Sequence, residues 1–227
     1  MRFDDGKQFT KFLSAIDTIV EEATFQVTPE GIKVRSMDPS RVALVEFWLP
    51  KSWFTEYECS DQKLCLDTKS FLSVMRRCGD DKAEFGLTSD GKLGIKFTGG
   101  NQTRDFSVPL LEVMEDELPP LRLLFSAKVK IYCWRLRDAL EDAKLVTDHV
   151  KLITDENGLK MIGKGDLMNA DIDLKKEALP TLEVQEQTKA VYSLSYLYEI
   201  VKAAADLADT VILEYKSEMP IKLSFEM

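Results

Sequence analysis

The hydrophobic residues between positions 7 and 21 recur at i, i+3, i+4 and i+7, which is the spacing of one helical face. Polar side chains such as Lys7 and Lys11 occupy the opposite face. This pattern predicts an amphipathic helix over 7–21. Similar patterns predict three more helices, over 68–78, 133–144 and 194–206.

Alternating apolar and polar residues predict strands between these helices. Ile32 and Val34 alternate with charged neighbours, and Asp38-Pro39-Ser40 supplies a turn before an apolar run that closes at Pro50. The sequence therefore predicts a hairpin of strands 31–37 and 41–49. Further strands are predicted at 24–28, 54–59, 63–67, 83–88, 92–97 and 103–110 in the first half, and at 123–131, 149–154, 158–163, 168–175, 181–185, 187–192, 210–216 and 220–226 in the second.

The same order of elements occurs twice along the chain. The segment 27–34 parallels 153–161, and Phe71-Leu72 parallels Tyr196-Leu197. Between the copies, acidic residues precede Leu118-Pro119-Pro120, which can continue neither a helix nor a central strand. We therefore predict an α+β fold in two similar domains, 1–111 and 123–227, joined by a linker at 112–122. The second copy lacks a counterpart of strand 103–110.

Composition narrows the class of protein. With 44% hydrophobic and 30% charged residues, the chain has the composition of an ordinary soluble globular protein. No apolar run approaches the roughly 20 residues of a membrane span, and the first residues do not read as a signal peptide. We expect an intracellular protein with no membrane partner. The net charge of −9 argues against nucleic-acid binding unless the positive charges are segregated onto one surface.

The sequence contains none of the familiar catalytic signatures. There is no P-loop, dinucleotide-binding GxGxxG, HExxH or nucleophile-elbow motif. The cysteines form no CxxC pair and His149 is the single histidine, so we expect neither a metal site nor a disulfide framework. Acidic clusters such as Asp80-Asp81 are better explained as turn charges than as paired catalytic carboxylates. We therefore expect a protein that is not an enzyme and that uses no cofactor.

Four segments spread along the chain are distinctive: 37–42, Arg104-Asp105-Phe106 with Pro109-Leu110, 125–129 and Glu218-Met219-Pro220. Together they resemble the sliding clamps of the proliferating-cell-nuclear-antigen family, and the archaeal members in particular. The resemblance spans the whole chain in order. It implies a duplicated DNA-clamp fold, in which antiparallel sheets lie outside and the two helices of each domain line the inner face. It also implies a DNA polymerase processivity factor, a ring around duplex DNA that docks replication and repair enzymes in the cytoplasm or nucleoid of an archaeon, or in a nucleus.

In the family, the helices face the DNA, so the resemblance implies that their basic residues contact phosphates. Such contacts do not distinguish between bases, and they weaken strongly as the salt concentration rises. Basic residues gathered on the helices would also explain how a chain of negative net charge binds DNA. The implied DNA-binding residues are Lys7, Lys11, Lys69, Arg76, Arg77, Arg137, Lys144 and Lys202.

The family's partners insert a short apolar motif into a pocket beneath the linker. The implied partners are DNA polymerase, the clamp loader, a flap nuclease and a ligase. Family members continue beyond the match with a further strand that forms one wall of this pocket, and the chain has no counterpart of it. Carried over residue by residue, the pocket consists of Met37, Arg41, Val42, Leu44, Leu118, Pro119 and Pro220.

Three family subunits close head to tail, with strand 103–110 of one subunit beside strand 168–175 of the next. Pairing these edge strands would cover backbone groups that otherwise invite aggregation. The alternative is a subunit of a mixed ring, or an accessory clamp-like protein that does not encircle DNA by itself. The implied interface residues are Arg104, Phe106, Val108, Leu110, Ala170, Ile172 and Leu174.

Overall fold

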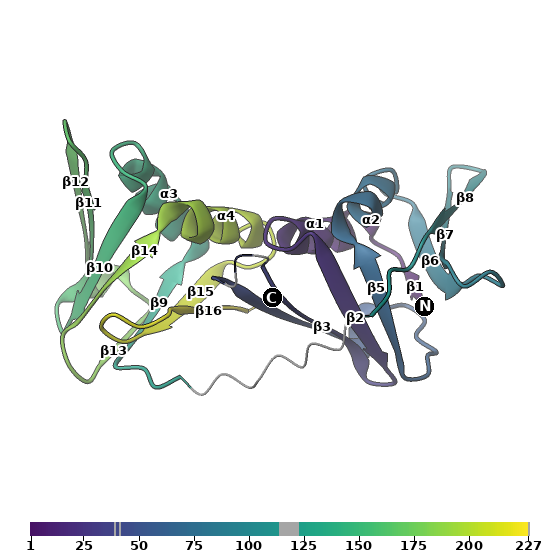
Figure 1. The fold of residues 1–227 in the computed structure, drawn as a ribbon, viewed down its shortest axis with the longest axis horizontal. Helices are drawn as coiled ribbons and strands as arrows, with labels where there is room; N and C mark the ends of the chain where they lie inside the picture. Colours follow the sequence, from purple (N-terminus) through teal and green to yellow (C-terminus); the bar gives the residue numbers. More distant parts are fainter. Residues whose placement is uncertain (39, 41, 114–122, 227) are drawn as a thin grey trace. The chain divides into compact units, whose positions relative to one another are not determined.

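The computed structural model describes residues 1–38, 40, 42–113 and 123–226, and the chain divides into two compact units, Met1–Pro119 and Pro120–Met227. Figure 1 shows that each unit combines antiparallel strands with two helices. The first unit contains β1 (Arg2–Phe3), α1 (Gly6–Asp17), β2 (Glu22–Thr28), β3 (Gly31–Met37), β4 (Leu44–Pro50), the 3-10 turn η1 (Lys51–Trp53), β5 (Gln62–Asp67), α2 (Thr68–Met75), β6 (Lys82–Leu87), β7 (Leu93–Gly99) and β8 (Gln102–Val108).

The second unit repeats this order. It contains β9 (Ala127–Tyr132), α3 (Cys133–Lys144), β10 (His149–Asp155), β11 (Gly158–Lys164), β12 (Asn169–Lys175), η2 (Lys176–Ala178), β13 (Thr181–Val184), β14 (Thr188–Ser193), α4 (Leu194–Ala204), β15 (Thr210–Tyr215) and β16 (Lys222–Glu226).

The sheets of the two units have matching strand orders. The order β4-β3-β2-β5 corresponds to β12-β11-β10-β14. In the other sheet, β1, β6 and β7 correspond to β9, β15 and β16, and the two sheets differ at both edges. In the first unit, the counterpart of β13 is reduced to an isolated bridge between Arg2 and Glu56. In the described part of the second unit, no strand lies beyond β16, whereas β8 lies beyond β7.

Two glycines confirm the predicted duplication at the level of the backbone. Gly31 and Gly158 open β3 and β11 with φ of 151° and 152°, a region that side chains with a Cβ rarely adopt. A Cβ at Gly31 would lie 2.3 Å from the Leu49 carbonyl oxygen, and one at Gly158 would lie 2.2 Å from the Leu174 carbonyl oxygen. The same close approach between neighbouring strands therefore occurs in both units.

Local sequence explains where the helices of the first unit begin. The Asp5 side chain accepts a hydrogen bond from the Gln8 amide at 3.1 Å and caps α1. Asp67 caps α2 in the same way through the Ser70 amide at 2.6 Å. The hydrogen bonds from Ser70 lower the pKa of the Asp67 carboxyl, so this cap stabilises the fold above the ordinary pKa of an aspartate and is lost as the pH falls through the lowered value.

The cores of the two units are filled differently. In the first unit, the Phe9 ring lies within 5.2 Å of the Phe85 ring and 6.2 Å of the Phe71 ring, between centroids. In the second unit the core is mainly aliphatic, and the buried Tyr215 hydroxyl shares a hydrogen bond with Thr154. Each large apolar side chain buried in this way stabilises its unit by about 1.5–3 kcal/mol relative to leaving it exposed.

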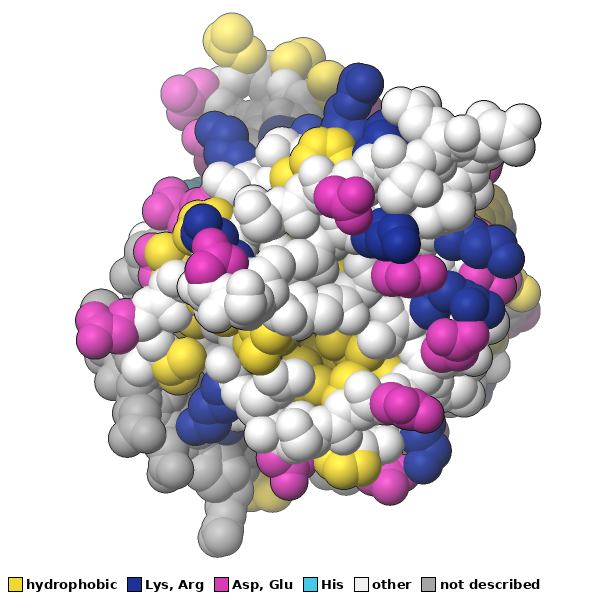
Figure 2. Space-filling view, turned by 90° about the vertical axis from the view of Figure 1, so that its right-hand side faces the viewer, with side chains coloured by type: hydrophobic (Ala, Val, Ile, Leu, Met, Phe, Trp, Pro, Cys, Tyr) yellow, Lys and Arg dark blue, Asp and Glu magenta, His cyan; other side chains and the backbone are white. Residues whose placement is uncertain are grey.

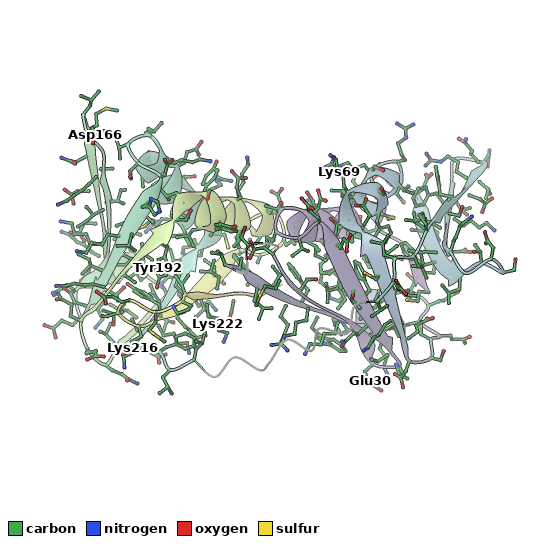
Figure 3. The ribbon with its side chains drawn as sticks, in the orientation of Figure 1. Glu30, Lys69, Asp166, Tyr192, Lys216 and Lys222 are labelled. Carbon is green, nitrogen blue, oxygen red and sulfur yellow. The ribbon has the colours of Figure 1, made fainter. Side chains whose placement is uncertain are left out.

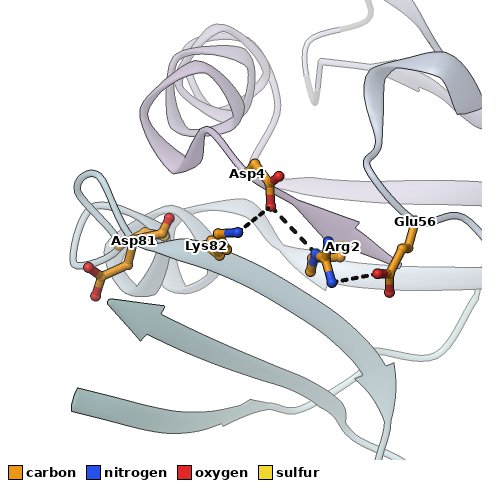
Figure 4. Close-up of polar contacts among 6 residues, drawn as sticks. Arg2, Asp4, Glu56, Asp81 and Lys82 are labelled. Atoms are coloured by element: carbon orange, nitrogen blue, oxygen red, sulfur yellow. Dashed lines mark hydrogen bonds and ion pairs between the residues drawn. The ribbon is translucent and has the colours of Figure 1, made fainter. Parts of the chain in front are cut away.

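The two-residue strand β1 is held by ion pairs as well as by its ladder. Figure 4 shows Arg2 bridging Asp4 at 3.5 Å and Glu56 at 2.5 Å, while Lys82 of β6 lies 3.7 Å from Asp4. These contacts connect the start of the chain to β6, beside which β1 pairs.

The α+β duplication is confirmed, but several local predictions are wrong. The strand predicted over 123–131 begins only at Ala127, the one over 41–49 begins only at Leu44, and the helix predicted over 194–206 ends at Ala204. The helix predicted over 7–21 ends at Asp17, and the one predicted over 68–78 ends at Met75; both continue only as turns, the second up to Gly79, whose φ of 61° ends it. Segment 54–59 forms no strand: its only ladder contact among the residues that the structure describes is an isolated bridge between Glu56 and Arg2. Phe54 is buried although it lies in a loop, which explains the apolar signal in the sequence. No described helix is both long and apolar enough to cross a membrane.

Candidate nucleic-acid interface

The two helices of the first unit lie side by side and are tied together at both ends. At one end, the Thr10 hydroxyl donates a hydrogen bond to the Met75 carbonyl at 3.1 Å. At the other, the Thr68 hydroxyl lies 2.9 Å from Asp17 Oδ1 and 2.8 Å from the Val20 carbonyl. The apolar stripe of α1 faces the core, so its polar stripe and that of α2 form one continuous surface.

Basic side chains dominate this helical surface of the first unit. Lys11, Lys69, Arg76 and Arg77 are exposed, and no carboxylate of the described residues forms an ion pair with them. Lys69 lies on α2 (Figure 3), and Arg76 and Arg77 follow directly after the last residue of that helix. Such a surface can attract anions, including the phosphates of a nucleic acid.

Lys7 differs from these four cations because it already has a partner. Its Nζ lies 2.6 Å from Asp80 Oδ1, and this hydrogen-bonded carboxylate raises the pKa of Lys7. The pair is exposed on both sides, so water and salt screen it. Lys7 therefore contributes less net positive charge to the surface than its position in the sequence predicts. Asp80 is 73 positions away from Lys7 in the sequence, so no local sequence pattern predicts this ion pair.

The helices of the second unit carry a mixed surface instead. Arg137 contacts the neighbouring Asp138 at 3.1 Å, and Lys144 contacts Glu199 at 3.2 Å. Lys202 forms no ion pair with a described carboxylate, and along α3 acidic and basic residues occur in equal number. The predicted basic residues are thus exposed or half-exposed in both units, but the unneutralised charge is concentrated in the first unit.

The predicted partner-motif pocket begins at the hairpin of β3 and β4. Met37 and Leu44 are directly paired across the two strands and half-buried, while Val42 in the connecting loop is 67% exposed. Pro220 is exposed in the turn before β16, which is attached to β14 by a hydrogen bond from the Tyr192 hydroxyl to the Met219 carbonyl at 2.9 Å. Figure 3 marks Tyr192. The remaining predicted pocket residues, Arg41, Leu118 and Pro119, lie outside the described residues.

Asp38 organises the loop of this hairpin, as the turn chemistry of Asp38-Pro39-Ser40 predicts. Its carboxylate is only 4% exposed and accepts hydrogen bonds from the amides of Ser40 at 3.0 Å, Val42 at 2.7 Å and Ala43 at 2.6 Å. An aspartate directly before a proline is a known turn former, so the signal was present in the sequence. The carboxylate therefore anchors the amide of the exposed Val42 and the amides of Ser40 and Ala43.

The two strands predicted to join subunits are both at sheet edges. β8 ends the order β1-β6-β7-β8 and β12 begins the order β12-β11-β10-β14, so each has one row of unpaired backbone groups in its own unit. Figure 2, viewed from the side on which β8 lies in Figure 1, shows basic and acidic side chains intermixed. Of the predicted contacts, Arg104, Phe106, Ala170, Ile172 and Leu174 are half-buried, Val108 is buried in its own core, and Leu110 follows the end of β8.

The described residues were also compared with the requirements of a metal site, of a reactive thiol and of a substrate cavity. No group of three or more His, Cys, Asp or Glu converges there on a possible metal position. Burial raises the pKa values of Cys78 and Cys133 to about 11, which keeps both thiols protonated and poor nucleophiles. An apolar cavity of about 30 Å³ in the first unit is too small for a substrate.

Comparison with known proteins identifies the fold family. The sequence model described as "Proliferating cell nuclear antigen, N-terminal domain" matches residues 1–115, and the corresponding C-terminal domain model matches residues 123–227. The chain belongs to the proliferating cell nuclear antigen (PCNA) family. The family resemblance inferred from the sequence is thereby confirmed.

Relatives and solved structures agree with this membership. The "DNA polymerase sliding clamp" of Thermococcus onnurineus is 36% identical over 227 positions, covering 98% of this chain and 90% of the relative. That of Pyrococcus furiosus is 35% identical over 226 positions with the same coverage. A crystal structure of PCNA from Thermococcus kodakaraensis matches with a TM-score of 0.92 at 27% identity, over 100% of this chain and 94% of that one.

A further solved structure shares the fold. A chain of the PCNA2-PCNA3 complex from Sulfolobus tokodaii matches with a TM-score of 0.89 at 23% identity, over 100% of this chain and 93% of that one. The predicted duplicated clamp fold, with its four helices and antiparallel sheets, is confirmed by these PCNA structures. The relatives' shared name also supports the sliding-clamp interpretation over the alternatives.

Proposed function

We propose that this chain is a DNA polymerase processivity factor: a sliding-clamp subunit that encircles duplex DNA and catalyses no reaction of its own. The observation that carries the proposal is that both halves match the PCNA family and that near-full-length relatives are named DNA polymerase sliding clamps. In this role, a ring of subunits tethers a polymerase to its template by topology rather than by tight binding.

The basic surface of the first unit is the DNA-contacting surface in this proposal. Lys11, Lys69, Arg76 and Arg77 carry free charge and would each neutralise a phosphate of the duplex. The second unit adds Lys202, with Arg137 and Lys144 weakened by their own carboxylates. Contacts to phosphates without base readout let a ring move along any sequence.

The hairpin of β3 and β4 is the docking element for partner enzymes in this proposal. An apolar motif presented on a short helix would bind to Met37, Val42 and Leu44. The exposure of Val42 and the paired Met37 and Leu44 support this assignment. The partners are those expected of a clamp: polymerase, clamp loader, flap nuclease and ligase.

Topological tethering has a direct test. The chain is loaded onto nicked circular DNA by a clamp loader, and DNA-bound protein is separated from free protein by gel filtration in high salt. Retention on the circle followed by release after one restriction cut is the expected result, because a closed ring leaves DNA only over an end. Release that does not depend on the cut would contradict the proposal.

A mixed ring is the second candidate, and the PCNA2-PCNA3 complex of Sulfolobus tokodaii is a precedent for it. A homotrimer requires the edges of β8 and β12 on this one chain to fit each other. We expect light scattering of the chain alone to give three times the chain mass of 25.8 kDa. A persistent monomer over a range of concentrations would instead favour the mixed ring.

A further inference from the structure

Two lysines on the helices of the second unit converge on one aromatic ring. Tyr198 of α4 is only 8% exposed. The Lys144 Nζ lies 4.4 Å from the centre of its ring, and the Lys202 Nζ lies 5.6 Å from it. Lys144 comes from the last turn of α3, which packs beside α4 (Figure 1), and Lys202 lies one turn further along α4 than the tyrosine.

The ring gives both lysines a common partner. The face of an aromatic ring attracts an ammonium group, most strongly where water is partly excluded. Lys202 stands at the i+4 position from Tyr198, so the helix itself brings the two side chains together. A long lysine side chain otherwise samples many rotamers, and the shared ring reduces that freedom before any ligand arrives.

One acidic side chain competes for this pair of cations. Glu199, the neighbour of Tyr198, places Oε1 at 3.2 Å from the Lys144 Nζ. The two side chains are 41% and 44% exposed, so the ion pair is solvated and an anion can reach and replace the carboxylate. No described carboxylate pairs with Lys202. The site therefore holds one free ammonium and one that is partly neutralised.

We propose that Tyr198 is a positioning residue that holds Lys144 and Lys202 as a two-point contact for phosphates of duplex DNA, and that Glu199 competes with phosphate for Lys144. This inference rests on the proposed function. The competition keeps the contact weak, since each phosphate gained costs the release of the carboxylate. A ring that moves along DNA needs contacts of this kind, which break as easily as they form.

The test is the salt dependence of DNA binding by the full chain. A short fluorescein-labelled duplex is titrated with protein, and its anisotropy gives an affinity at each of several salt concentrations. The slope of log affinity against log salt counts the phosphates contacted, at about 0.9 per phosphate. The variants are Glu199→Gln, Tyr198→Leu and Tyr198→Phe. The matched control is Glu183→Gln on β13, which removes the same charge from the same unit at an ion pair with Lys128.

We expect Glu199→Gln to bind more tightly and to steepen the slope by about 0.9, because Lys144 becomes free to contact a phosphate. Tyr198→Leu is expected to flatten the slope, while Tyr198→Phe keeps the ring and matches the unchanged chain. The inference is overturned if Glu199→Gln leaves the slope unchanged, or if Glu183→Gln steepens it equally. It is also overturned if Tyr198→Leu folds and keeps the original slope.

The stability of the Tyr198→Leu variant and the DNA binding of the unchanged chain are measured as well. If Tyr198→Leu lowers the melting temperature, the result for Glu199→Gln decides alone, because that side chain is at the surface. If the unchanged chain shows no salt-dependent binding to the duplex, the proposed function fails. Binding that depends on salt but is indifferent to these variants removes only the role of Tyr198 and Glu199.

Discussion

Replacing both Arg76 and Arg77 with glutamate is expected to lower the affinity for duplex DNA by about 100-fold at low salt. The two guanidinium groups are exposed beside α2 and pair with no described carboxylate, so their full charge is available to phosphates. The change removes two phosphate contacts and adds two repulsions in every subunit. The slope of log affinity against log salt should fall by about 1.8 for each subunit that contacts the duplex, which is two contacts at 0.9 each.

Arg76 is the C-cap of α2, so a glutamate there opposes the helix dipole at a cost of about 0.3–1 kcal/mol. Folding should survive this change, because both side chains are exposed and the cap itself is made by the backbone N–H of Arg76. The matched control is Lys63→Glu with Lys96→Glu. Both lysines are exposed on strands β5 and β7 of the same unit, and the control changes the net charge equally. Anisotropy titrations of both variants, with melting temperatures and light-scattering masses, give the comparison. Equal losses of affinity would mean that net charge matters and that the helical surface has no special role.

Much of the fold can be predicted from the sequence wherever burial follows a single period. The helix predicted over 133–144 matches α3 residue for residue, since its buried residues all fall on one stripe. The hairpin turn was located correctly for the same reason: Ile32 and Val34 alternate with charged residues, and Asp38 marks the loop. The duplication followed from two such patterns in the same order.

The errors occurred where burial continues beyond a regular element. Ile19 and Val20 extend the stripe of α1, but their amides bond to the Ile16 carbonyl in a turn, and Val20 is buried from there. The two residues of β1 are too short to show alternation. Its place is fixed by distant partners in β6 and by the bridge to Glu56. Periodicity carries no information about such contacts.

The same limit applies to the candidate site. Helical positions of the basic residues could be predicted, but which of them keep a free charge could not. Arg137 and Asp138 are adjacent in sequence, and that pair could have been anticipated. The partners Asp80 of Lys7 and Glu199 of Lys144 come from other elements. Tertiary structure therefore decides that the first unit carries most of the unneutralised charge.

Replacing Asp38 with alanine is expected to weaken binding of an apolar partner-motif peptide by about 10- to 100-fold, which corresponds to about 1.4–2.8 kcal/mol. The buried carboxylate accepts hydrogen bonds from three amides of its own loop, and bonds to a charged acceptor are worth about 1.5–3 kcal/mol each. Without them the amides of Ser40, Val42 and Ala43 lose their common acceptor, and ordering Val42 and Leu44 then costs free energy on binding. Titration of a labelled motif peptide followed by anisotropy measures the loss.

The matched control is Asp90→Ala, which removes a carboxylate from another turn of the same unit. The Asp90 carboxylate accepts a hydrogen bond from the Thr88 hydroxyl at 2.6 Å and pairs with Lys92 at 2.8 Å. We expect this variant to bind the peptide normally and both variants to bind duplex DNA normally, because the helical surface is unchanged. Leu44→Ser is a second variant, which removes a proposed apolar contact with the peptide and leaves the Asp38 carboxylate in place. If Asp38→Ala keeps full peptide affinity while Leu44→Ser loses it, the hairpin binds partners but does not need its loop held by Asp38. If both keep it, the docking element lies elsewhere on the molecule.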